Sequence, residues 1–250
     1  MHEKNLLNEC PIRYGILFDL FRRSTNEEEL IIDKILEKIK LKKHRNSLLD
    51  IGASDGNLIQ KIMKFFNNTY AIEKRDDSTL FLDSLGIDVL ENIWEDYKGR
   101  KKFDFILASH VFYYFPTSDW KMHLLKMMKL LNKEGILIVI TNSIESEYTD
   151  FLRTFYHKIL GEKFILESIF TYADNSNKDF KVTKERISTD IFLENKTHFL
   201  SMCEFWLGSS KENWGEIHEE ISDYYTTLKN RSPQGKTIKL DLDVLCIVRR

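Results

Sequence analysis

The spacing of apolar side chains changes twice along this chain of 250 residues, which divides it into three stretches. In the first 45 residues the apolar positions follow the period of an α-helix. They are Tyr14, Leu17, Phe18 and Phe21, followed by Leu30, Ile31, Ile35 and Ile39. The segment Ser24–Glu27 between these two sets is typical of a helix start, because a serine can cap the first turn and a glutamate three positions later can bond back. We therefore expect helices over residues 1–45.

Residues 46–141 alternate short apolar runs with helical patterns, and this alternation is typical of βαβ units. The predicted strands are Ser47–Ile51, Thr69–Glu73, Ile87–Leu90, Phe103–Ser109 and Ile136–Thr141, and the predicted helices are Asn57–Phe66, Asp77–Leu85 and Lys121–Leu131. Strands joined in this way lie parallel, and helices cover both faces of their sheet. The middle of the chain therefore predicts a doubly wound α/β sheet.

Residues 142–250 mix both patterns. Helices are predicted at Tyr148–Ile159, Thr197–Leu207 and Trp214–Leu228, and strands at Ile187–Phe192 and Thr237–Val248. We expect the last two strands to extend one edge of the sheet, which makes it mostly parallel and seven-stranded. The sequence contains no fixed-period repeat and no Pro/Gly-rich linker, so we predict a single domain over residues 1–250.

Net charge, apolar run length and cysteine spacing indicate which partners and which cellular compartment to expect. The formal net charge is -2, whereas a nucleic-acid-binding domain normally carries a basic excess, so no nucleic acid is expected. The longest apolar run, Ile136–Ile140, is far shorter than the roughly 20 residues of a membrane span, and residues 1–5 lack a signal-peptide pattern. The cysteines at positions 10, 203 and 246 are widely separated, which favours a reduced cytoplasmic protein without a metal site.

A glycine-containing loop, Gly52–Gly56, follows the first predicted strand and opens a helix. Glycine lets backbone approach a ligand closely, and a helix start offers unpaired N–H groups. The Gly-x-Gly-x-x-Gly fingerprint of dinucleotide-binding proteins needs a glycine at position 54, so Ser54 weakens a dinucleotide interpretation of this loop. The segment also matches Gly-x-Ser-x-Gly, the nucleophile elbow of α/β-hydrolases, but that serine needs several earlier strands, and only helical patterns precede Ser47.

The segment Asp50–Gly56 resembles the first motif of class I S-adenosylmethionine-dependent methyltransferases. Glu73 ends the second strand about 20 residues after the loop, at the offset of a ribose-binding carboxylate. Asn92 follows the third strand, where the family reads the adenine amine. Phe103–His110 resembles the family's fourth strand, and Asn132–Leu137 resembles the turn into its fifth. The resemblance thus rests on several motifs in order.

This resemblance implies a Rossmann-like methyltransferase with S-adenosylmethionine as its cofactor. The implied cofactor-binding residues are Gly52, Ser54, Gly56, Glu73, Asn92 and Ser109, while Asp50 and Asp55 would orient the loop or the amino group of the cofactor. Residues 1–45 would then form a helical cover, 46–141 the cofactor-binding half, and 142–250 substrate-shaping helices and edge strands. Without the motif, Glu73 would be interpreted as a solvated strand-end carboxylate and Asn92 as a turn residue.

Over nearly its full length the chain also resembles histamine N-methyltransferase and related small-molecule methyltransferases. This implies substrate-binding roles for Tyr14, Phe18, Glu27, Tyr113 and Asp241, and it places His110 where the relative has a substrate-binding glutamine. Asp241 replaces an asparagine, and together the two replacements argue against histamine itself. Aromatic rings set among polar groups suit a small amine or N-heterocycle. We expect His110 to take up a proton during methyl transfer, since its ordinary pKa lies near neutral pH.

Several alternatives stay open. Tyr14 and Phe18 are four positions apart and suit a helix core equally well. His110 would also serve as a hydrogen-bonded structural histidine, and Asp241 and Asp243 alternate as on the solvent face of a strand. Neighbouring Tyr113 and Tyr114 cannot face the same way. O-methylation of a small metabolite, and a protein that binds S-adenosylmethionine without turnover, are the rival functions. The sequence does not predict the oligomeric state.

Overall fold

The computed structural model describes residues 10–42, 44–161, 164–172, 178–232 and 235–250. The chain forms two compact units. The sheet unit comprises Glu29–Thr141, Glu167–Ile187 and Asp243–Arg250, and the helical unit comprises the chain up to Glu28, Asn142–Leu166 and Ser188–Leu242. The prediction of one domain over residues 1–250 stays a prediction.

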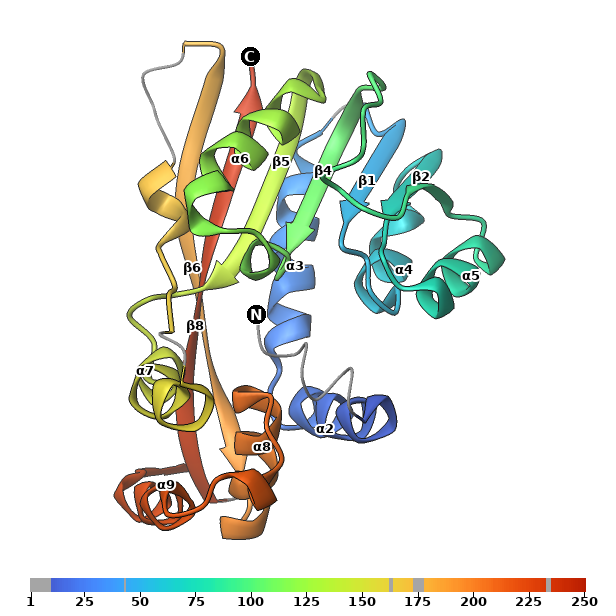
Figure 1. The fold of residues 1–250 in the computed structure, drawn as a ribbon. Coiled ribbons are helices and arrows are strands. Elements are labelled where there is room, and N and C mark those ends of the chain that lie inside the picture. The colour runs from blue at the N-terminus through green and yellow to red at the C-terminus, as the bar shows by residue number, and fades with distance from the viewer. Residues whose placement is uncertain (1–9, 43, 162–163, 173–177, 233–234) are drawn as a thin grey trace. The chain divides into compact units, whose positions relative to one another are not determined.

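The sheet has the strand order β3-β2-β1-β4-β5-β8-β6, and a short further strand, β7, pairs with β8. The strands are β1 Ser47–Ile51, β2 Asn68–Ile72, β3 Asp88–Glu91, β4 Phe103–Ser109, β5 Leu131–Asn142, β6 Phe180–Leu193, β7 Asn230–Ser232 and β8 Gly235–Arg249. Strands β1 to β5 pair in parallel, whereas β8 runs in the opposite direction (Figure 1). The predicted mostly parallel, doubly wound sheet with its two added edge strands is confirmed.

All the predicted helices are present, with ends shifted by a few residues. They are α2 Pro11–Arg23, α3 Glu27–Lys40, α4 Asn57–Met63, α5 Asp76–Ser84, α6 Trp120–Lys129, α7 Glu147–Leu160, α8 Lys196–Leu207 and α9 Ile217–Thr227. Short 3-10 helices, η1 Phe112–Tyr114, η2 Thr117–Asp119, η3 Ile169–Tyr172 and η4 Lys211–Asn213, complete the described chain. Within the described residues no helix is long and apolar enough to cross a membrane.

The core of the sheet unit is centred on β1 and β4 and contains both aliphatic and aromatic side chains. Leu49 and Ile106 are register partners in these strands, and both are fully buried. Helix α6 lies in front of the sheet and α3 behind it in Figure 1. Strands that are covered on both faces have largely continuous apolar sequences, which makes their ends easy to predict. β1 and β4 accordingly begin and end at the predicted residues.

The core of the helical unit contains a cluster of aromatic rings. The ring of Phe151 on α7 makes edge-to-face contacts with Phe199 and Trp206 on α8 and with Tyr224 on α9, at centroid distances of 5.9, 5.4 and 5.3 Å. Such pairs contribute roughly 0.5–1.5 kcal/mol each beyond the burial of their area. This cluster joins α7, α8 and α9 within the unit.

Candidate functional site

The carboxyl ends of four neighbouring parallel strands meet at one edge of the sheet unit. The residues that follow β1, β2, β3 and β4 are Gly52, Glu73, Asn92 and His110. In open α/β sheets, ligands bind beyond these ends, where the strand order reverses, and here that point lies between β1 and β4. The fold therefore brings together four of the predicted site residues.

The loop after β1 requires glycine at both of its predicted positions. Gly52 and Gly56 have φ angles of +76° and +73°, which L side chains rarely adopt. A Cβ atom on Gly52 would lie 2.9 Å from Cγ2 of Val111, and one on Gly56 would lie 2.9 Å from Cδ2 of Leu82. The loop is thus packed closely against the segment after β4 and against α5, and its backbone is held in place.

Glu73 connects the end of β2 to this loop. Its Oε2 accepts a hydrogen bond of 2.7 Å from the backbone N–H of Ser54, and its Oε1 accepts one of 2.9 Å from the N–H of Arg75. Glu73 is buried, with 6% of its surface exposed, so its interpretation as a solvated carboxylate is wrong. Each carboxylate oxygen retains capacity for a second hydrogen bond, as a pair of ribose hydroxyls would require.

A second carboxyl group lies beneath the loop. Asp50 is buried on β1, and its burial, together with the charge of Glu73, raises the pKa of Asp50 to about 7. Asp55 has a different role, because its Oδ1 accepts a hydrogen bond of 3.2 Å from the N–H of Asn57 at the start of α4. Two neighbouring carboxyl groups make this end of the sheet favourable for a cationic ligand group.

Asn92 and Ser109 lie at the same edge of the sheet but are more accessible. Asn92 is exposed, and its backbone N–H donates to Oε1 of Glu91 at 3.0 Å. Ser109 is half-buried at the end of β4, in register with Ile140 of β5. Both positions are compatible with the predicted cofactor contacts, which stay predictions.

His110 adopts a backbone conformation that is uncommon for its residue type. Its φ is +55°, and its N–H donates to the carbonyl of Ile140 at 2.9 Å. Its Nδ1 lies 3.2 Å from the hydroxyl of Tyr113, which is half-buried on η1. The adjacent Tyr114 is 42% exposed. This pairing of His110 with Tyr113 was not predicted. The signal that could have indicated it is their separation by three positions directly after a strand, which places the two side chains close together if the chain makes a turn there.

The predicted substrate residues in the helical unit are packed within that unit. The rings of Tyr14 and Phe18 stack at 6.0 Å on α2, and Phe205 of α8 lies 5.6 and 5.8 Å from them. The guanidinium of Arg22 lies 4.5 Å from the centre of the Phe18 ring. Glu27 is buried, and its N–H donates to Thr25 at 3.2 Å. These contacts support a core role for the two rings, and their substrate roles stay predictions.

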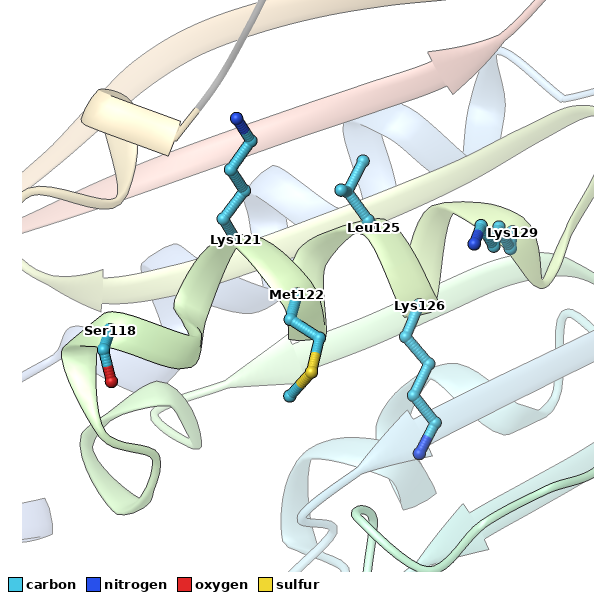
Figure 2. A pocket seen from close by; sticks show the side chains of 6 residues that line it. All are labelled: Ser118, Lys121, Met122, Leu125, Lys126 and Lys129. Atoms are coloured by element: carbon cyan, nitrogen blue, oxygen red, sulfur yellow. The ribbon is translucent and has the colours of Figure 1, made fainter.

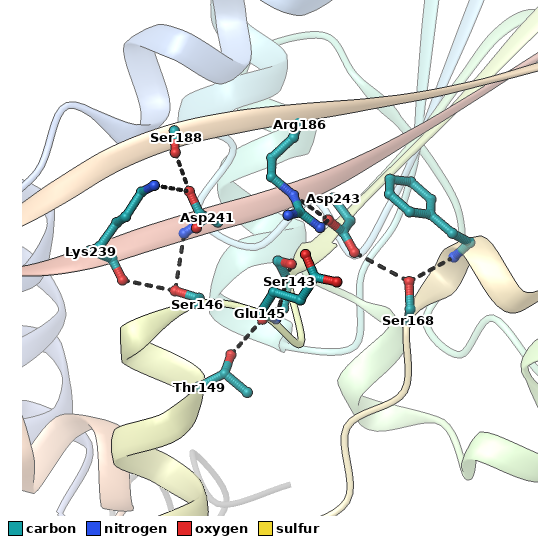
Figure 3. Close-up of polar contacts among 11 residues, drawn as sticks. Ser143, Glu145, Ser146, Thr149, Ser168, Arg186, Ser188, Lys239, Asp241 and Asp243 are labelled. Carbon is teal, nitrogen blue, oxygen red and sulfur yellow. Dashed lines mark hydrogen bonds and ion pairs between the residues drawn. The ribbon is translucent and has the colours of Figure 1, made fainter.

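Asp241 and Asp243 do not form a solvent-facing strand surface, and that alternative is wrong. In the helical unit the Asp241 carboxylate is buried, accepts a hydrogen bond from Ser188 and pairs with Lys239 at 3.7 Å (Figure 3). In the sheet unit Oδ1 of the buried Asp243 accepts hydrogen bonds of 3.0 and 2.9 Å from Nε and Nη2 of Arg186. The physical reason is charge pairing, since a carboxylate is buried only when partners satisfy it.

More than half of the chain, residues 21–164, matches the model of a protein family described as a methyltransferase domain. The chain belongs to this family. The predicted methyltransferase is thereby confirmed, and the dinucleotide and hydrolase interpretations of the glycine loop are set aside. Among curated proteins no sequence matches the chain, so the finer resemblance to histamine N-methyltransferase stays a prediction.

Solved structures share the fold of this methyltransferase domain at low sequence identity. A protein of Bacillus halodurans C-125, provisionally assigned as a methyltransferase, has a TM-score of 0.60 at 13% identity and covers 87% of this chain and 97% of its own. The plantazolicin methyltransferase, solved with a triazolic substrate analogue and S-adenosylhomocysteine, has a TM-score of 0.54 at 15% identity over 100% of both chains. Coclaurine N-methyltransferase, bound to N-methylheliamine and S-adenosylhomocysteine, has a TM-score of 0.50 at 15% identity, with 89% and 70% covered.

One hollow of the methyltransferase domain lies outside the candidate site. A shallow hollow on the exposed side of α6 is lined by Ser118, Lys121, Met122, Leu125, Lys126 and Lys129 (Figure 2), none of which is a predicted site residue. Among the residues that the structure describes, no group of His, Cys, Asp and Glu side chains is arranged to hold a metal ion.

Proposed function

We propose that the chain binds S-adenosylmethionine at the Gly52–Gly56 loop and transfers its methyl group to a nitrogen of a small amine or N-heterocycle. The observation that carries this proposal is the hydrogen bond between the Ser54 N–H and Glu73, because it joins the loop to the acidic residue of the second strand. Family membership supplies the reaction class, and Glu73 supplies the acceptor for the ribose hydroxyls.

Each cofactor residue has a role that follows from its chemistry. Gly52 and Gly56 let the loop adopt left-handed backbone angles while it packs against Val111 and Leu82, and the cofactor lies against the backbone that is held in this way. Glu73 accepts the ribose hydroxyls, and Asn92 at the end of β3 reads the adenine amine. Asp50, whose pKa lies at about 7 because of burial and the Glu73 charge, becomes ionised when a cationic group of the cofactor lies beside it.

The methyl transfer itself needs little covalent chemistry from the protein. The nitrogen lone pair of the acceptor attacks the methyl carbon as the bond from carbon to the sulfonium sulfur breaks, which leaves the neutral thioether S-adenosylhomocysteine. The acceptor nitrogen loses a proton, and His110 at the end of β4 receives it as a neutral imidazole. The protein has to hold the two reactants in line and exclude water.

Nitrogen is favoured over oxygen as the acceptor by a similar fold and by the residue types predicted to bind the substrate. Coclaurine N-methyltransferase, whose fold is similar, is an N-methyltransferase by name. The predicted substrate residues of the helical unit are aromatic rings and carboxylates, and both attract an amine. Tyr14, Phe18, Glu27 and Asp241 keep their substrate roles within this proposal. The three cysteines are free thiols, which is compatible with a reducing compartment, and we place the enzyme in the cytoplasm.

Cofactor binding is tested at Glu73. We expect Glu73→Ala to weaken S-adenosylhomocysteine binding about 100-fold, because two hydrogen bonds to a charged group are lost at about 1.5 kcal/mol each. Isothermal titration calorimetry measures this, and Asp83→Ala, on the exposed side of α5, is the control that retains affinity. A ligand with 2′-deoxyribose tests whether Glu73 binds the ribose or only supports the loop. If Glu73 binds the ribose, removal of the 2′-hydroxyl should reduce affinity less in Glu73→Gln than in the wild type. An equal loss in both proteins would remove Glu73 from the ribose site.

Turnover is tested with a panel of small amines, N-heterocycles and hydroxylated metabolites by following the release of S-adenosylhomocysteine. Turnover of amines supports the proposal, whereas turnover of hydroxylated acceptors alone would replace it with O-methylation. Cofactor binding without turnover of any class would indicate a non-catalytic binding protein. With a turned-over amine, His110→Ala should slow single-turnover methyl transfer at least 100-fold. An unchanged rate would show that His110 is not the proton acceptor.

A further inference from the structure

The ring of His110 is held from two sides within the sheet unit. Its backbone is held by the hydrogen bond from its N–H to the carbonyl of Ile140, in a left-handed conformation with φ of +55°. Its Nδ1 lies 3.2 Å from the hydroxyl of Tyr113, and the two rings lie 5.8 Å apart with a 42° angle between their planes. With backbone and Nδ1 both held, the direction of Nε2 is set as well.

The short helix η1 brings this tyrosine to the histidine. Phe112 is fully buried in η1 and anchors it through edge-to-face contacts with Phe115 and Trp120, at 5.6 and 5.4 Å. Tyr113 therefore projects from a fixed turn, three positions after His110. Tyr114 follows on the same turn but is 42% exposed. Of these two adjacent tyrosines, Tyr113 contacts the histidine, and Tyr114 is therefore a suitable control position.

A neutral imidazole carries one proton, and the partner of each nitrogen decides where it lies. A base must present a nitrogen lone pair to the acceptor, and this nitrogen cannot already carry a proton. If the Tyr113 oxygen accepts Nδ1–H, the lone pair is on Nε2, a buried atom. When Nε2 then takes the proton of the acceptor, the imidazolium retains its Nδ1–H bond to Tyr113, and the proton later leaves to water.

We propose that Tyr113 is a positioning residue that accepts a hydrogen bond from Nδ1–H of His110 and thereby presents the Nε2 lone pair as the proton acceptor. This inference rests on the proposed function for the role of His110, and it gives Tyr113 a role other than the substrate binding predicted from the sequence. The hydroxyl of Tyr113 acts through the histidine and does not need to touch the acceptor.

The protonation state of the histidine rings is measured by long-range proton–nitrogen NMR on the whole chain at pH 8 without any substrate. His110→Gln identifies the His110 signals by their disappearance. We expect the proton of His110 on Nδ1 in the wild type, a mixture of both neutral forms in Tyr113→Phe, and no change in Tyr114→Phe, the matched control. A wild-type His110 protonated on Nε2, or a ratio unchanged in Tyr113→Phe, would overturn the proposal. The wild-type spectrum alone decides this if Tyr113→Phe does not fold.

Kinetics with a turned-over acceptor give the second readout. We expect kcat of Tyr113→Phe to fall about tenfold, the effect of one hydrogen bond to a charged group, with unchanged affinity for S-adenosylhomocysteine. An unchanged kcat, or a fall matched by Tyr114→Phe, would contradict the positioning role. Failure of the proposed function is distinguishable, because it would appear as absent cofactor binding or absent turnover while the NMR result still reports the His110–Tyr113 pair.

Discussion

At the scale of single residues, two independent constraints require glycine at position 52. The backbone φ of +76° is strained for any residue with a Cβ, and a Cβ there would lie 2.9 Å from the side chain of Val111. Gly15 is a contrasting position, because it lies inside helix α2 and a Cβ there would have nothing within 4 Å. The two glycines therefore allow the effect of an added methyl group to be compared directly.

We expect Gly52→Ala to lower the free energy of unfolding by about 2 kcal/mol or more, since it adds left-handed strain and overpacking. The same variant should bind S-adenosylhomocysteine at least tenfold more weakly, because the loop has to shift. Gly15→Ala should raise the free energy of unfolding by about 0.5–1 kcal/mol, as expected for alanine in a helix. Urea unfolding and calorimetry measure both effects. If Gly52→Ala were as stable as the wild type, the close contact with Val111 would be disproved.

The extent to which the sequence predicted individual site residues depended on how far away their partners lie. Glu73 could be predicted from its distance to the loop, and its partner Ser54 is only 19 positions away. Asp241 was interpreted as a substrate ligand or a solvent-facing residue, yet its partners Ser188 and Ser146 are 53 and 95 positions away. Contacts over such separations leave no periodic signal, so the burial of Asp241 could not be predicted.

At the scale of elements, the burial of both faces decided which strands were predicted accurately. β1 and β4 have the predicted bounds, because nearly all of their residues are buried and their apolar runs are continuous. β6 was predicted only at Ile187–Phe192, whereas it begins at Phe180. None of the side chains in its first seven residues is fully buried, which is typical of a strand at the edge of a sheet. Polar residues occur there, so this part of the strand has no apolar run from which it could be predicted.

Within the helical unit, the C-terminal end of α2 is held by a hydrogen bond from His198. Nδ1 of His198 accepts the backbone N–H of Glu194 at 3.3 Å, so Nε2 carries the proton and donates to Ser24 at 2.9 Å. The Ser24 hydroxyl in turn donates to the carbonyl of Leu20 at 2.6 Å. Burial lowers the pKa of His198 in the folded protein, and the charge of Glu194 opposes this only in part.

We expect the helical unit to lose stability as the pH falls below about 6.5, the ordinary pKa of histidine. The unfolded chain takes up a proton there that folded His198 resists, so protonation favours unfolding. Hydrogen exchange of the α2 amides, corrected for intrinsic rates, should therefore accelerate between pH 7.5 and pH 5.5. His198→Gln should remove most of this dependence, and His218→Gln on α9 should retain it. Equal pH dependence in His198→Gln and the wild type would refute the assignment.

At the scale of the whole molecule, each of the two units has a core of its own. Leu49, Phe105 and Ile106 are fully buried on β1 and β4 in the sheet unit, whereas the helical unit depends on the ring of Phe151 and its neighbours on α8 and α9. The proposed cofactor residues all lie in the sheet unit. A change in the aromatic core is therefore expected to alter stability without altering cofactor affinity.

Phe151→Leu tests this separation. It should lower the free energy of unfolding by about 1–2 kcal/mol, since a ring and its edge-to-face contacts are lost from a fully buried position. Affinity for S-adenosylhomocysteine should stay within twofold of the wild type. Thermal unfolding and calorimetry give the two values, and Leu49→Ala in the sheet unit should reduce both. A tenfold loss of affinity in Phe151→Leu would show that the aromatic core contributes to cofactor binding.

The ribose contact proposed for Glu73, the residue that is bonded to the Ser54 N–H, has a consequence for turnover. The ribose is the same in S-adenosylmethionine and in its demethylated product, so a carboxylate that recognises the ribose hydroxyls stabilises both to the same degree. Such uniform binding lowers the cofactor concentration needed for saturation but does not accelerate the chemical step. It also retains the product. The rate in a cell would then follow the ratio of methylated to demethylated cofactor, and an enzyme that degrades the product would be needed to sustain it.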